Sequence, residues 1–218
     1  MATKESKVVK AVEVKEETIS ITAPKIETIV FKIEGTSPFV QLRFAQKTKY
    51  EMTERMASAS KASKGKRDAR DYDAEFENAM YLSSDGWRGI PSTAFRCAMI
   101  SACRTVGFKM TLAKLSVFII ADGFDADDGT PLTKITSGKP KLVQHACRNA
   151  NGNTDIRTRA MWEKWTASVK VSYDANQFSA TDVSNLMLRA GMQVGVGEGR
   201  NDSRNSAGMG WGNFKILA

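Results

Sequence analysis

The chain has 218 residues, 42% of them hydrophobic, and 32 lysine and arginine residues against 24 acidic ones give it a net charge of +8. A basic surplus of this size indicates nucleic acid or another anionic partner. The chain contains three cysteines but no CxxC pair, no run of the roughly 18 apolar residues that span a membrane, and a charged opening segment unlike a secretory signal. We therefore expect a cytoplasmic protein in a reducing compartment, with no membrane partner.

The opening segment is rich in lysine, glutamate, valine and threonine and shows no amphipathic rhythm. We expect residues 1–25 to form an N-terminal arm that either stays loose or packs on a neighbouring molecule. The first convincing strand follows at Ile26–Gly35, where β-branched residues dominate and a glycine ends the run. We expect residues 26–218 to form a single domain.

The composition changes over Lys47–Arg70, which has eight basic and three acidic residues and a centre of only small or basic residues. A long loop of this kind is either a solvated excursion or a functional arm. The excess of positive charge favours contact with phosphates. The candidate contacts in and just before this segment are Arg43, Lys61, Lys64, Lys66, Arg67 and Arg70.

A helix is predicted over residues 92–106, because Pro91 precedes it, Ser92 or Thr93 can cap it, and Gly107 can end it. The residues that form its apolar face are Phe95, Ala98, Met99, Ala102, Cys103 and Val106.

The apolar run Ala113–Gly123 has the length of a strand and predicts a central one. The acidic turn that follows lacks the spacing of a calcium-binding loop. We therefore predict a hairpin tip there and no metal site.

The segment Lys141–Trp162 combines arginines, asparagines and tryptophans, together with the only histidine, His145. Arginine with interleaved aromatic and amide side chains suits contact with a nucleic-acid backbone and base stacking. The alternative is a surface hairpin that a tryptophan anchors to the core. The candidate contacts are Arg148, Arg157, Arg159 and Trp162.

The last third of the chain contains the patterns of a strand, a helix and a final strand. Apolar and polar residues alternate over Trp165–Tyr173, which predicts a half-buried strand. Ser179 and Asp182 form the pattern of a capping box at the start of an amphipathic helix, and Gly191 is expected to end it. A final strand is predicted within residues 212–217.

A glycine-rich segment lies between that helix and the final strand. Gly195 and Gly197 suit a dinucleotide fingerprint, but Arg200 stands at the third glycine position, and such loops follow a strand and open a helix. Bare backbone beside arginine suits close approach of a phosphate; a flexible connector is the alternative. The candidate contacts are Gly197, Gly199, Arg200, Arg204, Gly208 and Gly210.

Without its insertions, the chain reads strand, helix, strand, strand, helix, strand. This α+β order predicts a ferredoxin-like, RRM-like βαββαβ core with two helices on one face of an antiparallel sheet. The two large insertions fall at about residues 36–85, a thumb-like basic loop, and 122–163, a second β-rich insertion.

Two segments resemble the RAMP superfamily, which includes the repeated backbone subunits of CRISPR surveillance complexes. "GIPSTAFRCAMISACR" (Gly89–Arg104) is similar to the family's turn into its first helix, although Cys97 and Ile100 replace its internal glycine and its arginine. "VGVGEGRNDSRNSAGMGWGNFKI" resembles the family's glycine-rich loop before the last strand. The resemblance adds Ser92 and Arg96 to the candidate contacts.

This resemblance implies a subunit that binds single-stranded nucleic acid, typically RNA, without catalysis or cofactor, and that polymerises side by side with copies of itself. Other subunits of a ribonucleoprotein would be further partners. Two alternatives stay open. One is a phage structural or self-assembling protein, or a mimic of a CRISPR subunit; the other is an endoribonuclease that uses Asp68, Asp71 or Asp73 of the thumb-like insertion.

Overall fold

The larger sheet contains the core strands of the predicted fold. The computed structural model describes residues 22–44, 50, 53, 70–148, 152, 154–203 and 208–217. Four antiparallel strands lie in the order β11–β1–β10–β5, and the chain order is β1–α3–β5–β10–α5–β11. This is the ferredoxin-like arrangement, so the α+β prediction is confirmed. The bounds are β1 Ile26–Gly35, α3 Ser92–Ala102, β5 Val117–Ile120, β10 Thr166–Asp174, α5 Ala180–Arg189 and β11 Phe214–Ile216.

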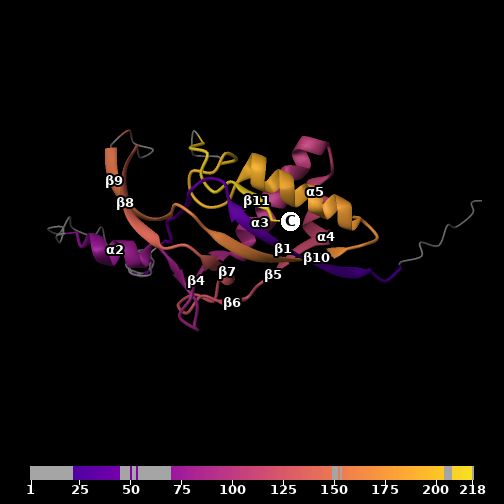
Figure 1. The fold of residues 1–218 in the computed structure, drawn as a ribbon, viewed down its shortest axis with the longest axis horizontal. Helices are drawn as coiled ribbons and strands as arrows, with labels where there is room; N and C mark the ends of the chain where they lie inside the picture. Colours follow the sequence, from indigo (N-terminus) through magenta and orange to yellow (C-terminus); the bar gives the residue numbers. More distant parts are fainter. Residues whose placement is uncertain are drawn as a thin grey trace, which may run out of the picture.

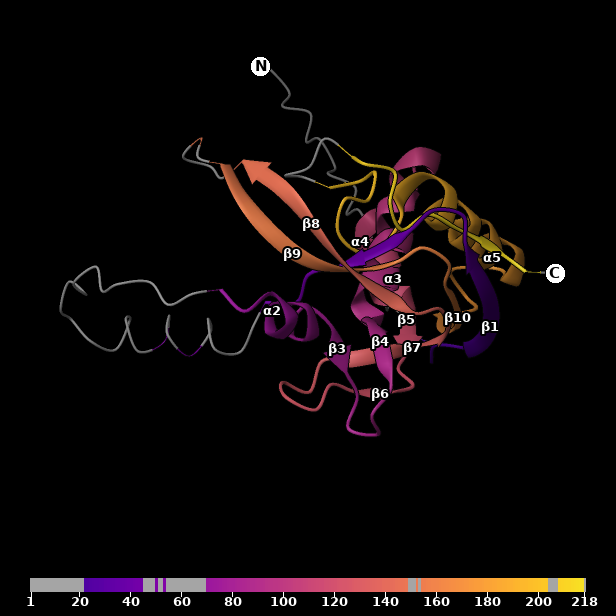
Figure 2. The ribbon, with the colours of Figure 1, turned by 60° about the vertical axis from the view of Figure 1, so that its left-hand side comes forward.

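The remaining strands and helix α2 lie between β1 and α3 and between β5 and β10, close to where the sequence predicts insertions. Strands β3, β4, β6 and β7 extend the larger sheet, which β7 joins through its pairing with β10. Strands β2, β9 and β8 form a second, three-stranded sheet, and the β8–β9 hairpin extends away from the core (Figure 2). The bounds are β2 Phe39–Gln41, α2 Tyr72–Asn78, β3 Tyr81–Leu82, β4 Arg88–Pro91, β6 Gly123–Phe124, β7 Pro131–Ser137, β8 Pro140–Arg148 and β9 Thr154–Trp162.

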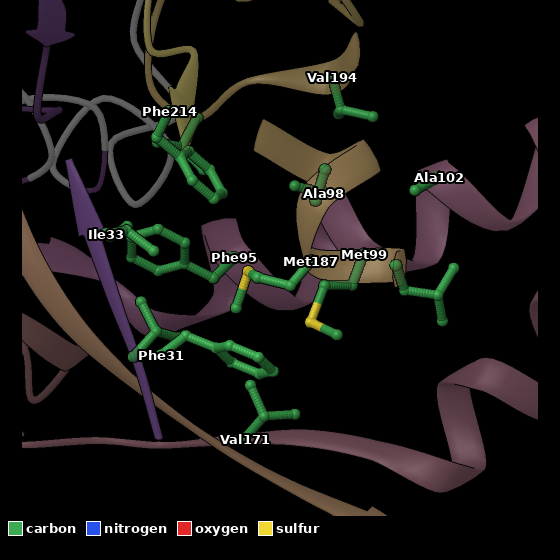
Figure 3. Close-up of a cluster of buried hydrophobic side chains, with 14 of the residues drawn as sticks. Phe31, Ile33, Phe95, Ala98, Met99, Ala102, Val171, Met187, Val194 and Phe214 are labelled. Carbon is green, nitrogen blue, oxygen red and sulfur yellow. The ribbon is translucent and has the colours of Figure 1, made fainter. Parts of the chain in front are cut away.

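Helices α3 and α5 lie on the same face of the sheet (Figure 1). The predicted alternation holds along β10, where every second side chain is buried, and the capping box of Ser179 and Asp182 forms at the start of α5. Between the layers, Phe31 of β1, Phe95 of α3, Met187 of α5 and Phe214 of β11 are buried in one cluster (Figure 3). Burial of this apolar surface drives the two layers together. In the described part of the chain, no helix has the length and hydrophobicity needed to cross a membrane.

Two local predictions about apolar residues are wrong in part: the strand predicted within Ala113–Gly123 forms only over Val117–Ile120, and the buried helical face excludes Val106. The first half of the apolar run Ala113–Gly123 belongs to helix α4 (Met110–Ser116), because Ala113 and Ser116 are buried one turn apart while Leu115 is 76% exposed. A short apolar run does not distinguish strand from helix. Val106 is 49% exposed and lies in the 3₁₀ turn η1 (Cys103–Val106), so it is not part of the buried face of α3.

Gly191 does not end the second helix, contrary to the prediction. The chain continues as a π-helical turn, η2 (Ala190–Val194), and Gly195, with φ at +76°, ends it. A Cβ atom at position 191 would lie 2.2 Å from the carbonyl oxygen of Phe214. Gly191 therefore permits close packing of the helix against β11 rather than a change of direction.

A buried ion pair joins Arg43, which follows β2, to Asp125, which begins the acidic turn after β6. Arg43 is 7% exposed; its Nη2 lies 2.6 Å from Asp125 Oδ2, and its Nη1 lies 2.7 Å from Asp127 Oδ2. Asp125 also accepts hydrogen bonds from the backbone amides of Leu82 and Asp128. The structure therefore places Arg43 inside the fold, where its guanidinium faces two carboxylates and not the surface predicted to contact nucleic acid.

Replacing Arg43 with methionine should destabilise the protein by about 3–5 kcal/mol, because the change leaves the carboxylate of Asp125 buried without its cation. The matched control is R88M, which breaks the exposed pair of Arg88 and Glu77 and should cost about 1 kcal/mol or less. Urea denaturation measures both free energies of unfolding. Equal losses in the two variants would contradict the assignment of Arg43 to the interior.

Candidate nucleic-acid groove

A cavity of about 450 Å³, here called the loop groove, lies where three segments of the chain meet. Its walls come from residues 39–42 of β2 and its extension, residues 90–101 at and after the start of α3, and residues 194–202 of the glycine-rich loop, together with Tyr81. The fold thus brings the start of α3 and the glycine-rich loop, which are far apart in the sequence, into one cavity.

The glycine-rich loop folds tightly against its neighbours. Gly197 and Gly199 have φ values of +83° and +68°, a region that side chains other than glycine rarely adopt. A Cβ atom at Gly197 would lie 2.6 Å from the ring of Phe39, and one at Gly199 would lie 2.4 Å from the ring of Trp211. The amide of Glu198 donates to the carbonyl oxygen of Val40 and fixes the loop to β2. Positive φ and close contact therefore both require glycine here.

The β8–β9 hairpin also holds the loop. The Nε atom of Arg159, which is 3% exposed, donates to Glu198 at 2.7 Å, and its Nη2 contacts Glu198 and the sulfur of Cys147. The hydrogen bond from Arg159 to Glu198 is the main cause that raises the pKa of Arg159. The ring of His145 packs on Trp211, with centroids 5.1 Å apart. These contacts join the hairpin to one wall of the groove.

The charges of the loop groove leave one positive side chain. Glu198 pairs with Arg159, and Asp202 pairs with Arg104. Burial acts to raise the pKa of Asp202, but hydrogen bonds from Arg104 and Ser101 outweigh it, and the pKa lies below its ordinary value. Asp202 is therefore ionised at neutral pH and neutralised by Arg104. Arg200 is the remaining charged residue of the lining: its Nη1 donates to the carbonyl oxygen of Gly197 at 3.0 Å, and its charge also contributes to lowering the pKa of Asp202.

The α3 wall supplies small polar groups. Thr93, Cys97 and Ser101 recur on one side of the helix and line the groove. Ser92 is instead buried, and its hydroxyl lies 3.0 Å from that of Thr133, so it supports the start of the helix from inside. On the opposite wall, Leu42 is 42% exposed and offers an apolar surface.

The other candidate residues lie in different parts of the fold. Trp162 is 1% exposed, and the centroid of its ring lies 5.4 Å from that of Phe39. It therefore anchors the hairpin to the core, as the alternative interpretation of this segment predicts. Arg96 donates to the carbonyl oxygens of Val117 and Lys114 and lies outside the groove. Arg70 pairs with Glu75 beside the hairpin. Arg157 is half-buried on β9, and Gly208 and Gly210 have positive φ at the far end of the loop.

Four basic candidates, Lys61, Lys64, Lys66 and Arg67, lie outside the described residues, as does Arg204. Arg148 ends β8.

Sequence reasoning missed several residues of the groove. Glu198 and Asp202 were hidden inside the glycine-rich segment, and only their distant partners, Arg159 and Arg104, explain their presence. Thr93, Cys97 and Ser101 carry a usable signal, because spacings of four residues place polar side chains on one face of a helix. Leu42 carries none, because exposure of a single apolar residue is ordinary.

The chain was compared with known proteins. No protein-family model matches the sequence, and no curated protein matches it significantly. Among solved structures, it is similar to the crystal structure of Cmr6 from Pyrococcus furiosus, with a TM-score of 0.42 and 13% sequence identity, over 88% of this chain and 99% of that chain. A likeness of this degree is too low to transfer a function.

Replacing Gly197 with alanine should destabilise the protein by more than the strain of positive φ alone, because the new methyl group meets Phe39 and the Val40 carbonyl oxygen. The matched control is G86A: Gly86 has φ at +81° but no atom within 4 Å of the added Cβ, so only the strain of about 1–2 kcal/mol applies. Urea denaturation compares the two variants. A loss in G197A no larger than in G86A would show that the loop is loosely held.

Proposed function

We propose that this chain binds single-stranded RNA without cleaving it, and that the loop groove holds part of the strand. One observation carries the proposal: the start of α3 and the glycine-rich loop line a single groove in which the acidic side chains are neutralised by arginines and Arg200 is left positive. A positive groove with bare backbone and small polar groups suits a sugar–phosphate backbone.

The wider charge of the molecule supports this proposal. The net charge of +8 favours polyanions over small neutral ligands. Gly208 and Gly210 lie beyond Arg200 with positive φ, and a Cβ atom at Gly210 would meet only the side-chain oxygen of Asn201, at 3.9 Å. A phosphate can therefore approach the backbone at this end of the loop more closely than it could approach residues with side chains.

The resemblance of Gly89–Arg104 and of the glycine-rich loop to RAMP proteins supports RNA over DNA as the ligand. It also supports further partners, namely copies of this chain side by side along the strand and other subunits of a ribonucleoprotein. In this proposal the thumb-like basic segment, with Lys61, Lys64, Lys66 and Arg67, contacts phosphates beyond the groove or a neighbouring copy.

Replacing Arg200 with alanine should weaken binding of single-stranded RNA by about 10- to 100-fold, because a charge-assisted hydrogen bond contributes about 1.5–3 kcal/mol. The slope of log affinity against log salt concentration should become shallower by about 0.7, the value for one phosphate contact on a single strand. Fluorescence anisotropy with a labelled oligonucleotide at several salt concentrations measures both quantities.

The matched control is R189A, which removes an arginine of α5 that lies outside the loop groove and should leave the affinity within about twofold. Binding that is equal in wild type and R200A, or absent in wild type at low salt, would overturn the proposal. The RNA is recovered after incubation with Mg²⁺ and should be intact; cleavage would instead favour the ribonuclease interpretation.

A further inference from the structure

A second hollow, here called the helix groove, lies between α5, η1 and the turn that precedes α5. It has a volume of about 650 Å³ and an apolar floor. Phe178 and Leu186 are buried there, and Phe108 packs on Phe178 with ring centroids 4.7 Å apart.

The rim of the helix groove exposes large apolar side chains. Met192 is 68% exposed, Val106 49% and Leu188 39%, and all three line the same hollow. Single exposed apolar residues are ordinary, but a contiguous apolar patch around a hollow indicates a surface that another segment covers. The rim also holds one carboxylate, Asp182, and one guanidinium, Arg189.

The start of the described chain lies beside this groove. The carbonyl oxygen of Lys25 accepts a hydrogen bond of 2.7 Å from the amide of Ala175, and that of Ala23 accepts one of 3.4 Å from Asn176. The next two residues, Gln177 and Phe178, line the groove. In Figure 1 the beginning of β1 and the turn before α5 lie at the same end of the molecule. The described chain therefore begins next to the rim of the helix groove.

The sequence of this N-terminal segment suits an apolar groove with a mixed rim. Residues 8–14 read Val-Val-Lys-Ala-Val-Glu-Val, so five apolar side chains are combined with one lysine and one glutamate. The connection from residue 15 to residue 21 is seven residues long and can span up to about 25 Å when extended. A connection of this length gives a tethered segment a high effective concentration at the groove, so weak contacts suffice for docking.

We propose that residues 8–14 of the N-terminal segment dock in the helix groove of the same chain and cover its apolar rim. Three features support this docking: the exposed apolar rim, the start of the described chain beside the groove, and the apolar stretch at a suitable distance along the sequence. It does not depend on RNA binding, so it is tested on the full chain without RNA.

Hydrogen–deuterium exchange of the full chain should show amides of residues 8–14 slowed by about tenfold or more relative to an unstructured peptide. M192K introduces a charge into the rim and should remove this protection. The paired variant V12K/V14K should remove it as well, and should speed exchange in residues 177–193. Met192 is exposed, so M192K should fold, which circular dichroism verifies.

The matched control is V30K, because Val30 is 55% exposed on the opposite face of the sheet, and the variant should retain the protection. Exchange at the rate of an unstructured peptide in the wild-type chain would overturn the proposal, as would protection that survives both M192K and V12K/V14K. Protection that rises with protein concentration, together with dimers in sedimentation, would also overturn it and would show that a second copy supplies the segment.

Discussion

The ion pair of Arg159 and Glu198 is the interaction on which the rest of the candidate site depends. Arg159 comes from the β8–β9 hairpin and Glu198 from the glycine-rich loop, and the guanidinium is almost fully buried. Burial of a charge is expensive unless the partner stays in place, so neither segment can move independently without a large cost. The pair therefore fixes the loop wall of the groove relative to the core, to which the hairpin is anchored by Trp162.

The same pair determines the electrostatics of the groove. A loop with two acidic residues would repel a polyanion if both charges were free. Glu198 is neutralised from the hairpin and Asp202 from Arg104 near the end of α3, so the loop is held by its acidic residues and still presents Arg200. Structural roles and the proposed contact with RNA are thus divided among residues that follow one another closely in the sequence.

The sequence predicts the core well because its signals there are local. The alternation along β10 and the capping box at Ser179 each need only neighbouring residues. The sequence predicts a helix end at Gly191, but this glycine instead allows close packing against Phe214, which belongs to another element of the fold. Arg43 and Arg159 suggested a nucleic-acid surface, but their partners lie 82 and 39 residues away, and no local pattern shows that a charge is buried. The sequence shows the two motifs that line the groove, but it does not show that they meet in one cavity.

The sequence of the glycine-rich loop suits either a flexible connector or a ligand site. The geometry at Gly197 and Gly199 is that of a tightly packed segment, which is compatible with a ligand site. Gly197 and Gly199 adopt positive φ against Phe39 and Trp211, so these glycines allow dense packing. A loop packed in this way holds its backbone in one conformation before any ligand arrives. Preorganisation of this kind lowers the entropy cost of binding, which means that the packing demand on the glycines and the proposed contact with a polynucleotide favour the same residues.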